Sequence, residues 1–208
     1  MQYSQIDLPS NNATVLTQAL DSLVERHYAV IPNFLLVNMQ QALLQELLQK
    51  QNDGFFHAAN IGRGQHQARH SQIRGDSICW LEEDFALGKQ YLAMMEQLRQ
   101  QLNQDFYLGL RSFEGHYAHY QIGSVYQRHV DRHKDNNARV VSAVCYLNQD
   151  WPIEAGGELK LYDNNNQLLL TLPPIGGTLV LFMSADMPHE VLAAHRSRYS
   201  IAGWFRQD

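Results

Sequence analysis

The sequence predicts an α+β fold, with helices in the first half of the chain and short strands in the second half. Two observations carry this prediction. Apolar residues recur at helical spacing in three segments of the first half, whereas seven short apolar segments, separated by polar or Gly/Pro turns, follow one another after residue 112. Many short strands without intervening helices are typical of a sandwich or barrel, such as a jelly roll.

Three helices are expected, over residues 14–26, over a segment that begins at Asn38, and over residues 86–104. Asn38 is a suitable N-cap because its side chain can accept a hydrogen bond from a backbone N–H group of the first turn. The second helix would bury a face of leucines, namely Leu43, Leu44, Leu47 and Leu48.

Strands are expected at 27–34 and 77–81 in the first half of the chain. The polar segment 60–76 has no apolar periodicity, and a long loop of this kind in a compact domain is often functional. The second half contains seven further expected strands, at 113–122, 139–147, 158–162, 167–172, 177–183, 189–193 and 198–206.

Length and charge limit the class of protein. The 208 residues suit one domain, 1–208, in which 1–112 supplies mainly supporting helices and the first strands and 113–208 supplies the β core. A net charge of -5 disfavours broad nucleic-acid binding, which rests on Lys and Arg that neutralise phosphates. We expect no membrane span and no signal peptide, and therefore a cytoplasmic location. The oligomeric state is left open.

Histidine and aspartate two positions apart indicate a candidate metal site. Strand alternation would place His129 and Asp131 on one face, where both can bind one ion. A second motif, His133-x-Asp135, follows at once in a polar run that is typical of a solvated turn. A chain with ten histidines and 21 acidic residues contains such motifs by chance, so the first motif needs further support.

A histidine from a distant strand would complete a facial triad, which binds Fe(II) and leaves coordination positions open. His189 follows an apolar strand and is a candidate, although a surface histidine in a turn is an equal alternative on spacing alone. Nine positions later, Arg198 opens the apolar strand 199–205. A guanidinium there needs an anion, either an internal acidic residue or the far carboxylate of a dicarboxylate that chelates the metal.

From residue 120 to the C-terminus the chain resembles the prolyl hydroxylases that act on hypoxia-inducible factor and their bacterial relatives. The segments that carry the resemblance are YQRHVD (126–131), CYLNQDW (145–151), GGEL (156–159), PHEV (188–191) and RYSIAGW (198–204), preceded by IRGDSICW (73–80). The resemblance implies a double-stranded β-helix, with Fe(II), 2-oxoglutarate and O2 as cofactors and ascorbate as the reductant. It also implies that His129, Asp131 and His189 are the iron ligands, which favours the first His-x-Asp motif.

The resemblance also implies a site for the cosubstrate. Arg198 would bind the distal carboxylate of 2-oxoglutarate, Tyr146 would donate a hydrogen bond to the same carboxylate, and Tyr120 would lie close by. Where the animal enzymes carry a threonine, this chain has Ala202. Ser200 points to the same strand face as Arg198 and would restore the lost hydroxyl.

Four further residues are expected at the substrate side of the pocket. Trp204 would line the pocket near the metal, although a plain core tryptophan is equally natural in this strand. In the family a flexible loop, here 60–76, closes over the peptide substrate. Arg74 and Asp76 belong to the end of this loop, and Arg139 is a candidate ionic partner for it, with ordinary surface charge as the alternative.

The function expected from this resemblance is hydroxylation of a prolyl residue in another protein, with succinate and CO2 as coproducts and a translation elongation factor loop as the first target to test. Alternatives are a hydroxylase of free proline or another small molecule, and a non-catalytic binding module. Nucleobase demethylation on the same metal core is disfavoured, because the second arginine usual in those enzymes would stand at Trp204.

Overall fold

The computed structural model describes residues 13–59, 73–132 and 138–208. Its elements are three α-helices, one short 3-10 helix and eleven strands. They are α1 (Ala13–Arg26), β1 (Tyr28–Ile31), α2 (Val37–Asn52), β2 (His57–Ala58), β3 (Asp76–Trp80), α3 (Ala86–Phe106), β4 (Ser112–Tyr120), β5 (Tyr126–His129), β6 (Arg139–Tyr146), η3 (Ile153–Ala155), β7 (Leu159–Tyr162), β8 (Leu168–Leu172), β9 (Leu179–Met183), β10 (His189–Val191) and β11 (Arg198–Arg206).

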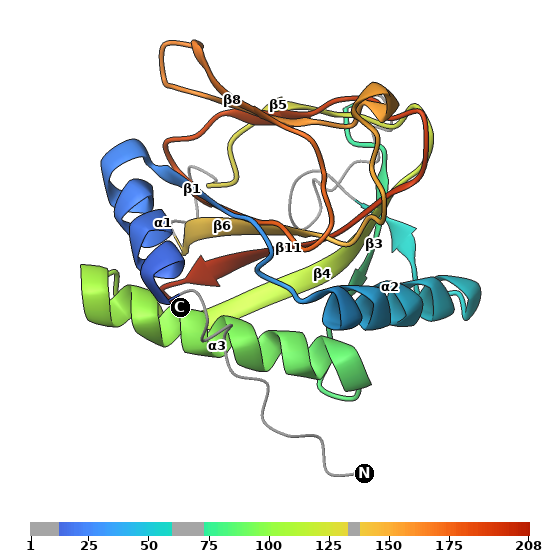
Figure 1. Ribbon diagram of the computed structural model, residues 1–208, viewed down its shortest axis with the longest axis horizontal. Coiled ribbons are helices and arrows are strands. Elements are labelled where there is room, and N and C mark those ends of the chain that lie inside the picture. The colour runs from blue at the N-terminus through green and yellow to red at the C-terminus, as the bar shows by residue number, and fades with distance from the viewer. Residues whose placement is uncertain (1–12, 60–72, 133–137) are drawn as a thin grey trace.

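The strands form two antiparallel sheets that pack face to face (Figure 1). The larger sheet has the order β1-β9-β6-β11-β4-β3-β2, and the smaller sheet has the order β5-β10-β7-β8. Buried side chains from both sheets meet in one apolar cluster, among them Ala118 and Phe182 of the larger sheet and Leu161 and Val191 of the smaller one. This architecture confirms the predicted α+β class and the jelly-roll arrangement of the second half.

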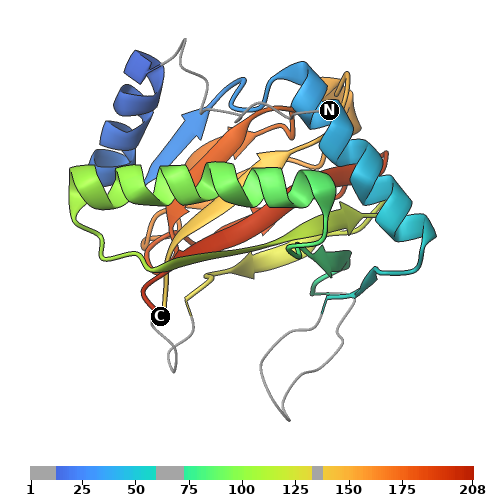
Figure 2. The ribbon, with the colours of Figure 1, turned by 90° about the horizontal axis from the view of Figure 1, so that it is seen from below.

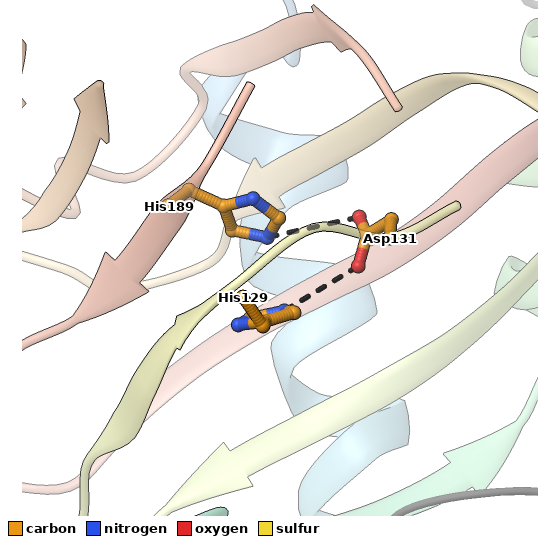
Figure 3. A group of neighbouring side chains, drawn as sticks. All are labelled: His129, Asp131 and His189. Carbon is orange, nitrogen blue, oxygen red and sulfur yellow. Dashed lines mark ion pairs between the residues drawn. The ribbon is translucent and has the colours of Figure 1, made fainter. Parts of the chain in front are cut away.

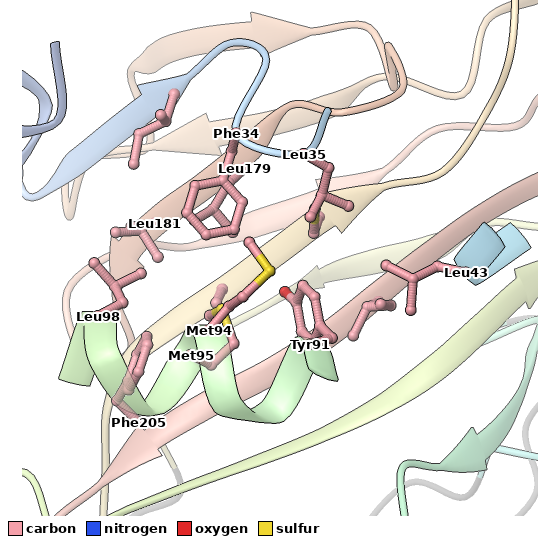
Figure 4. Close-up of a cluster of buried hydrophobic side chains, with 14 of the residues drawn as sticks. Phe34, Leu35, Leu43, Tyr91, Met94, Met95, Leu98, Leu179, Leu181 and Phe205 are labelled. Atoms are coloured by element: carbon pink, nitrogen blue, oxygen red, sulfur yellow. The ribbon is translucent and has the colours of Figure 1, made fainter. Parts of the chain in front are cut away.

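The three helices cover the outer face of the larger sheet, where α3 runs across the strands (Figure 2). A second apolar cluster fills this layer and contains Met95 and Leu98 of α3, Leu43 of α2 and Leu181 of β9 (Figure 4). Each of these four side chains is fully buried. The helices therefore form a rigid support that leaves the inner face of the sheet free to build a site.

Strand alternation decides which residues reach the space between the sheets. In β11, Ile201 and Phe205 pack against the helices, whereas Arg198, Ser200 and Trp204 face the opposite side. Neighbouring strands present residues to the same space, because β4 and β6 both pair with β11 in antiparallel register, with one irregularity in the β6 pairing between Phe205 and Arg206. The inner face of the larger sheet thus carries polar side chains at positions that alternate with core residues.

The start of α2 differs from the prediction. Leu36, not Asn38, occupies the N-cap, and no side chain caps the helix. Tertiary contacts set this start: the backbone N–H of Leu35 donates to the carbonyl of Gly177, and the buried side chain of Gln40 donates to the carbonyls of Leu147 and Asn148. In the described part of the chain, no helix combines the length and apolarity that a membrane crossing requires.

Candidate active site

A cavity of about 500 Å³ lies between the two sheets. Apart from Tyr146, every residue that the sequence predicted for the site lines this cavity: His129, Asp131, His189, Arg198, Tyr120, Ser200, Trp204, Arg74, Asp76 and Arg139. Tyr146 is adjacent, with its ring centroid 5.1 Å from the guanidinium carbon of Arg198. Residues from distant parts of the chain therefore meet at one place.

Two histidines and one aspartate form a compact cluster at one side of the cavity (Figure 3). His129 ends β5 and His189 begins β10, and these strands pair so that the two residues lie opposite each other. The Nε2 atom of His129 is 3.4 Å from Oδ1 of Asp131, and Nε2 of His189 is 3.7 Å from Oδ2. One potential ligand atom from each residue lies within 4.8 Å of the others, a spacing that suits one bound metal ion.

Backbone carbonyls orient both imidazole rings. The Nδ1 atom of His129 lies 2.8 Å from the carbonyl oxygen of Gln127, and Nδ1 of His189 lies 2.9 Å from that of Met187. Because a carbonyl can only accept, each Nδ1 carries the proton and each Nε2 keeps its lone pair. Both lone pairs therefore belong to the nitrogens that face Asp131, as a metal site requires.

The protonation states also fit a cation. Burial lowers the pKa of His189 to about 4, so its imidazole is neutral at neutral pH. Burial by itself would raise the pKa of Asp131, but His189, His129 and the hydroxyl of Ser142 hold that pKa well below its usual value. Ser142 donates to Oδ2 of Asp131 at 2.7 Å, and its own oxygen lies 2.8 Å from the hydroxyl of Ser184. Ser142 was not among the predicted site residues, and its signal in the sequence is a single hydroxyl residue within an apolar strand.

Arg198 lines the same cavity and is a buried cation that has no acidic partner among the described residues. Only 1% of its surface is exposed, and no Asp or Glu of the described segments forms an ion pair with it. Its Nε donates to the carbonyl of Gly157 at 3.0 Å, and its Nη1 lies 3.5 Å from the hydroxyl of Ser200. A buried guanidinium in this state is costly unless an anion binds it.

Two tyrosines flank the guanidinium and complete a cradle for an anion. The guanidinium carbon lies 5.0 Å from the ring centroid of Tyr120 and 5.1 Å from that of Tyr146. Burial raises the pKa of Tyr146 to about 12, so its phenol keeps its proton. That hydroxyl is buried and has no hydrogen-bond partner among the described residues. A carboxylate beside Arg198 would satisfy both groups, so the cradle fits one end of a dicarboxylate.

The remaining predicted residues form ion pairs at the cavity wall. Arg74 donates to both carboxylate oxygens of Asp76, at 2.7 and 3.0 Å. Arg139 donates to Glu114 and lies over the indole of Trp204, with its guanidinium carbon 3.4 Å from the ring centroid. Residues 60–72 and 133–137 lie outside the described residues, so the pairing of Arg139 with the loop and the surface position of the second His-x-Asp motif stay predictions.

The chain is similar to known proteins over the region that contains this site. The sequence profile of the 2OG-Fe(II) oxygenase superfamily matches residues 115–206, a range that includes His129, Asp131, His189 and Arg198. The chain is 26% identical over 203 residues to a hypoxia-inducible factor prolyl hydroxylase of Caenorhabditis elegans. The match covers 92% of this chain but only 28% of the worm protein.

Two solved structures match over almost the whole chain. A prolyl-4-hydroxylase of Pseudomonas putida is 38% identical, with a TM-score of 0.84 over 93% of this chain and 99% of the other. A prolyl hydroxylase of Trichoplax adhaerens, solved in complex with a peptide fragment of the hypoxia-inducible factor oxygen degradation domain, is 28% identical, with a TM-score of 0.80 over 95% and 91% of the two chains. These similarities confirm the predicted double-stranded β-helix.

Proposed function

This chain belongs to the 2OG-Fe(II) oxygenase superfamily, among the relatives of the prolyl hydroxylases, and from this premise we propose that it hydroxylates a prolyl residue in another protein. The family uses Fe(II), 2-oxoglutarate and O2, so the chain is a dioxygenase enzyme. The proposal adds the substrate, a proline within a polypeptide, and the coproducts succinate and CO2.

One observation carries the proposal most strongly. The His129, Asp131 and His189 cluster lines the same 500 Å³ cavity as the buried Arg198, which forms no ion pair with an acidic residue of the described segments. A metal site alone suits many reactions, but a metal site that shares its cavity with a guanidinium in need of an anion suits a cosubstrate that has two anionic ends. 2-Oxoglutarate has this chemistry, because its keto acid can chelate a metal while its distal carboxylate pairs with an arginine.

We assign the residues as follows. His129, Asp131 and His189 would hold Fe(II) through two Nε2 atoms and a carboxylate oxygen. Arg198 would bind the distal carboxylate of 2-oxoglutarate, with Tyr146 and Ser200 as hydrogen-bond donors and Tyr120 as a flanking ring. The bound iron supplies the activation of O2 that couples oxidative decarboxylation of 2-oxoglutarate to oxidation of an unactivated C–H bond. The chain's own part is to orient both reactants and to exclude side reactions.

The part of the cavity wall at the other end of β11 from Arg198 has features that favour a peptide substrate. Trp204 and Arg139 lie there, together with Glu114 and the exposed Trp80. Tryptophan and arginine dominate the binding energy of many protein–protein contacts. One solved relative is in complex with a peptide fragment, which favours the same class of substrate here. A translation elongation factor loop as target, ascorbate as reductant and a cytoplasmic location remain predictions from the sequence.

Mass spectrometry tests the proposal directly. The enzyme is incubated with Fe(II), ascorbate, 2-oxoglutarate and a panel of proline-containing peptides that includes the elongation factor loop. The expected result is a gain of one oxygen on a prolyl residue, with a matching amount of succinate. His189→Ala serves as the control and should give neither product.

Two outcomes would contradict the proposal. Turnover of free proline or of another amino acid, with no peptide hydroxylated, would replace it with a small-molecule hydroxylase. Absence of 2-oxoglutarate conversion under every condition would favour a binding module on the same fold.

A further inference from the structure

A buried histidine in the cavity wall takes no part in the metal cluster or in the cosubstrate cradle. His116 lies in β4, and 1% of its surface is exposed. Both ring nitrogens are buried, and neither has a hydrogen-bond partner within the described residues. Because burial lowers the pKa of His116 to about 3, the ring is neutral and offers one donor and one acceptor.

Trp204 adds a second unsatisfied donor beside this histidine. The two ring centroids are 5.5 Å apart, and the indole Nε1 of Trp204 is also buried without a partner in the described part of the chain. Arg139 lies over the face of the indole, and Glu114 accepts hydrogen bonds from Arg139 and from Arg206. These contacts fix the orientation of the indole, so its N–H group is held in place before any ligand arrives.

His116 and Trp204 have access to solvent past the side chain of Trp80. The rings of Trp80 and His116 meet edge to face at a centroid distance of 5.0 Å. Trp80 lines the cavity and is 39% exposed, whereas His116 and Trp204 lie deeper. A ligand that enters past Trp80 would therefore meet an aromatic wall first and the unsatisfied nitrogens next.

An amide group fits the hydrogen-bonding pattern of this place. Two donors and one acceptor have no hydrogen-bond partner among the described residues, and leaving such groups unpaired in a buried site is costly. A carbonyl oxygen has two lone pairs and can accept from both donors, while an amide N–H can donate to the histidine. The rings of His116 and Trp204 are neutral, and the nearby Arg139 and Arg74 already form ion pairs with Glu114 and Asp76. A charged ammonium or carboxylate group is therefore a poorer match for this place than a neutral amide.

We propose that His116 and Trp204 form a subsite that binds a backbone amide of the polypeptide substrate, with His116 as a specificity-determining residue. This inference rests on the proposed function and deepens it, because it explains how a proline within a peptide is preferred over a free amino acid. In free proline no backbone amide is available to satisfy the pair.

Kinetic measurements on the wild-type enzyme and three variants test the subsite, with the elongation factor loop peptide as the probe. His116→Phe keeps an aromatic ring but removes both hydrogen-bonding atoms, and His116→Gln retains a donor and an acceptor. His119→Gln is the matched control, because His119 lies on the same strand but faces the helices. For His116→Phe we expect the peptide KM to rise about tenfold, equivalent to about 1.4 kcal/mol, with the 2-oxoglutarate KM nearly unchanged.

The other variants separate recognition from folding. His116→Gln should recover most of the peptide affinity, and His119→Gln should leave the peptide KM unchanged. The melting temperature of His116→Phe should not fall, because the substitution removes unsatisfied polar atoms from a buried place. A purely structural role would instead lower the melting temperature and raise both KM values together.

A backbone-modified peptide gives an independent readout. Ester analogues of the probe replace one amide N–H at a time with oxygen, at each position around the proline. At one position the ester should weaken binding to wild type but not to His116→Phe, the pattern of two groups that interact directly. An equal peptide KM in wild type and His116→Phe, with no position-specific ester effect, would overturn the subsite. Failure of wild type to hydroxylate any peptide would instead overturn the proposed function, and the subsite with it.

Discussion

Backbone carbonyls and a hydroxyl, rather than the ligands alone, determine the geometry of the candidate metal centre. The carbonyls of Gln127 and Met187 select the tautomers of His129 and His189, and Ser142 holds the carboxylate of Asp131. Groups of this kind orient metal ligands, and their loss commonly weakens metal affinity by about 10- to 100-fold. The side chains are therefore arranged for a metal before any ion binds.

Removal of each candidate histidine distinguishes the two His-x-Asp motifs at the residue scale. His129→Ala should abolish iron-dependent conversion of 2-oxoglutarate to succinate, because it removes one of the three proposed iron ligands. His133→Ala should leave the conversion intact. Succinate formation by purified variants measures both effects, and the reverse pattern would show that the second motif holds the iron.

At the scale of elements, the turn between η3 and β7 positions Arg198. Gly157 has a φ of +75°, and its carbonyl accepts the hydrogen bond from the arginine Nε. A Cβ atom at this position would lie 2.9 Å from Cβ of Ala194 and 3.4 Å from Cδ of Arg198. Only glycine satisfies both the backbone conformation and the close approach.

A glycine substitution tests this positioning role. Gly157→Ala should destabilise the protein by about 1–3 kcal/mol through strain and crowding, and it should also raise the KM for 2-oxoglutarate. Gly54→Ala is the matched control, since Gly54 has a φ of +80° but no atom of the described residues within 4 Å of its Cβ position. Urea denaturation measures stability in both variants. An equal 2-oxoglutarate KM in the two variants would contradict a specific role for Gly157.

At the scale of the whole molecule, the two face-to-face sheets, supported from outside by the helical layer, form a cavity whose polar groups are incompletely paired. Among the described residues, Arg198 has no acidic partner, and the hydroxyl of Tyr146 has no hydrogen-bond partner. Such groups reduce the stability of the ligand-free protein, and a ligand that pairs with them restores it. The folded state should therefore be coupled to ligand binding.

Thermal unfolding tests this coupling. Mn(II), as a stand-in for Fe(II), and 2-oxoglutarate are each added at about a hundredfold excess over their Kd. Each ligand should then stabilise the folded state by about 2.7 kcal/mol and raise the melting temperature. Arg198→Met should keep the response to metal but lose the response to 2-oxoglutarate, and its ligand-free form should be no less stable than wild type. A response to 2-oxoglutarate that survives in Arg198→Met would show that the cosubstrate binds elsewhere.

The sequence by itself determined the α+β class, the three helices and most strands, because period and composition are local properties of the chain. It also indicated His129, Asp131, His189 and Arg198 through spacing and family resemblance. Only the tertiary structure decided that β5 and β10 pair to bring the two histidines together and that Leu36 rather than Asn38 precedes α2. It also decided that Ser142 and His116 line the cavity and that Gly157 approaches Arg198. These features depend on contacts between residues far apart in the chain, which local patterns do not encode.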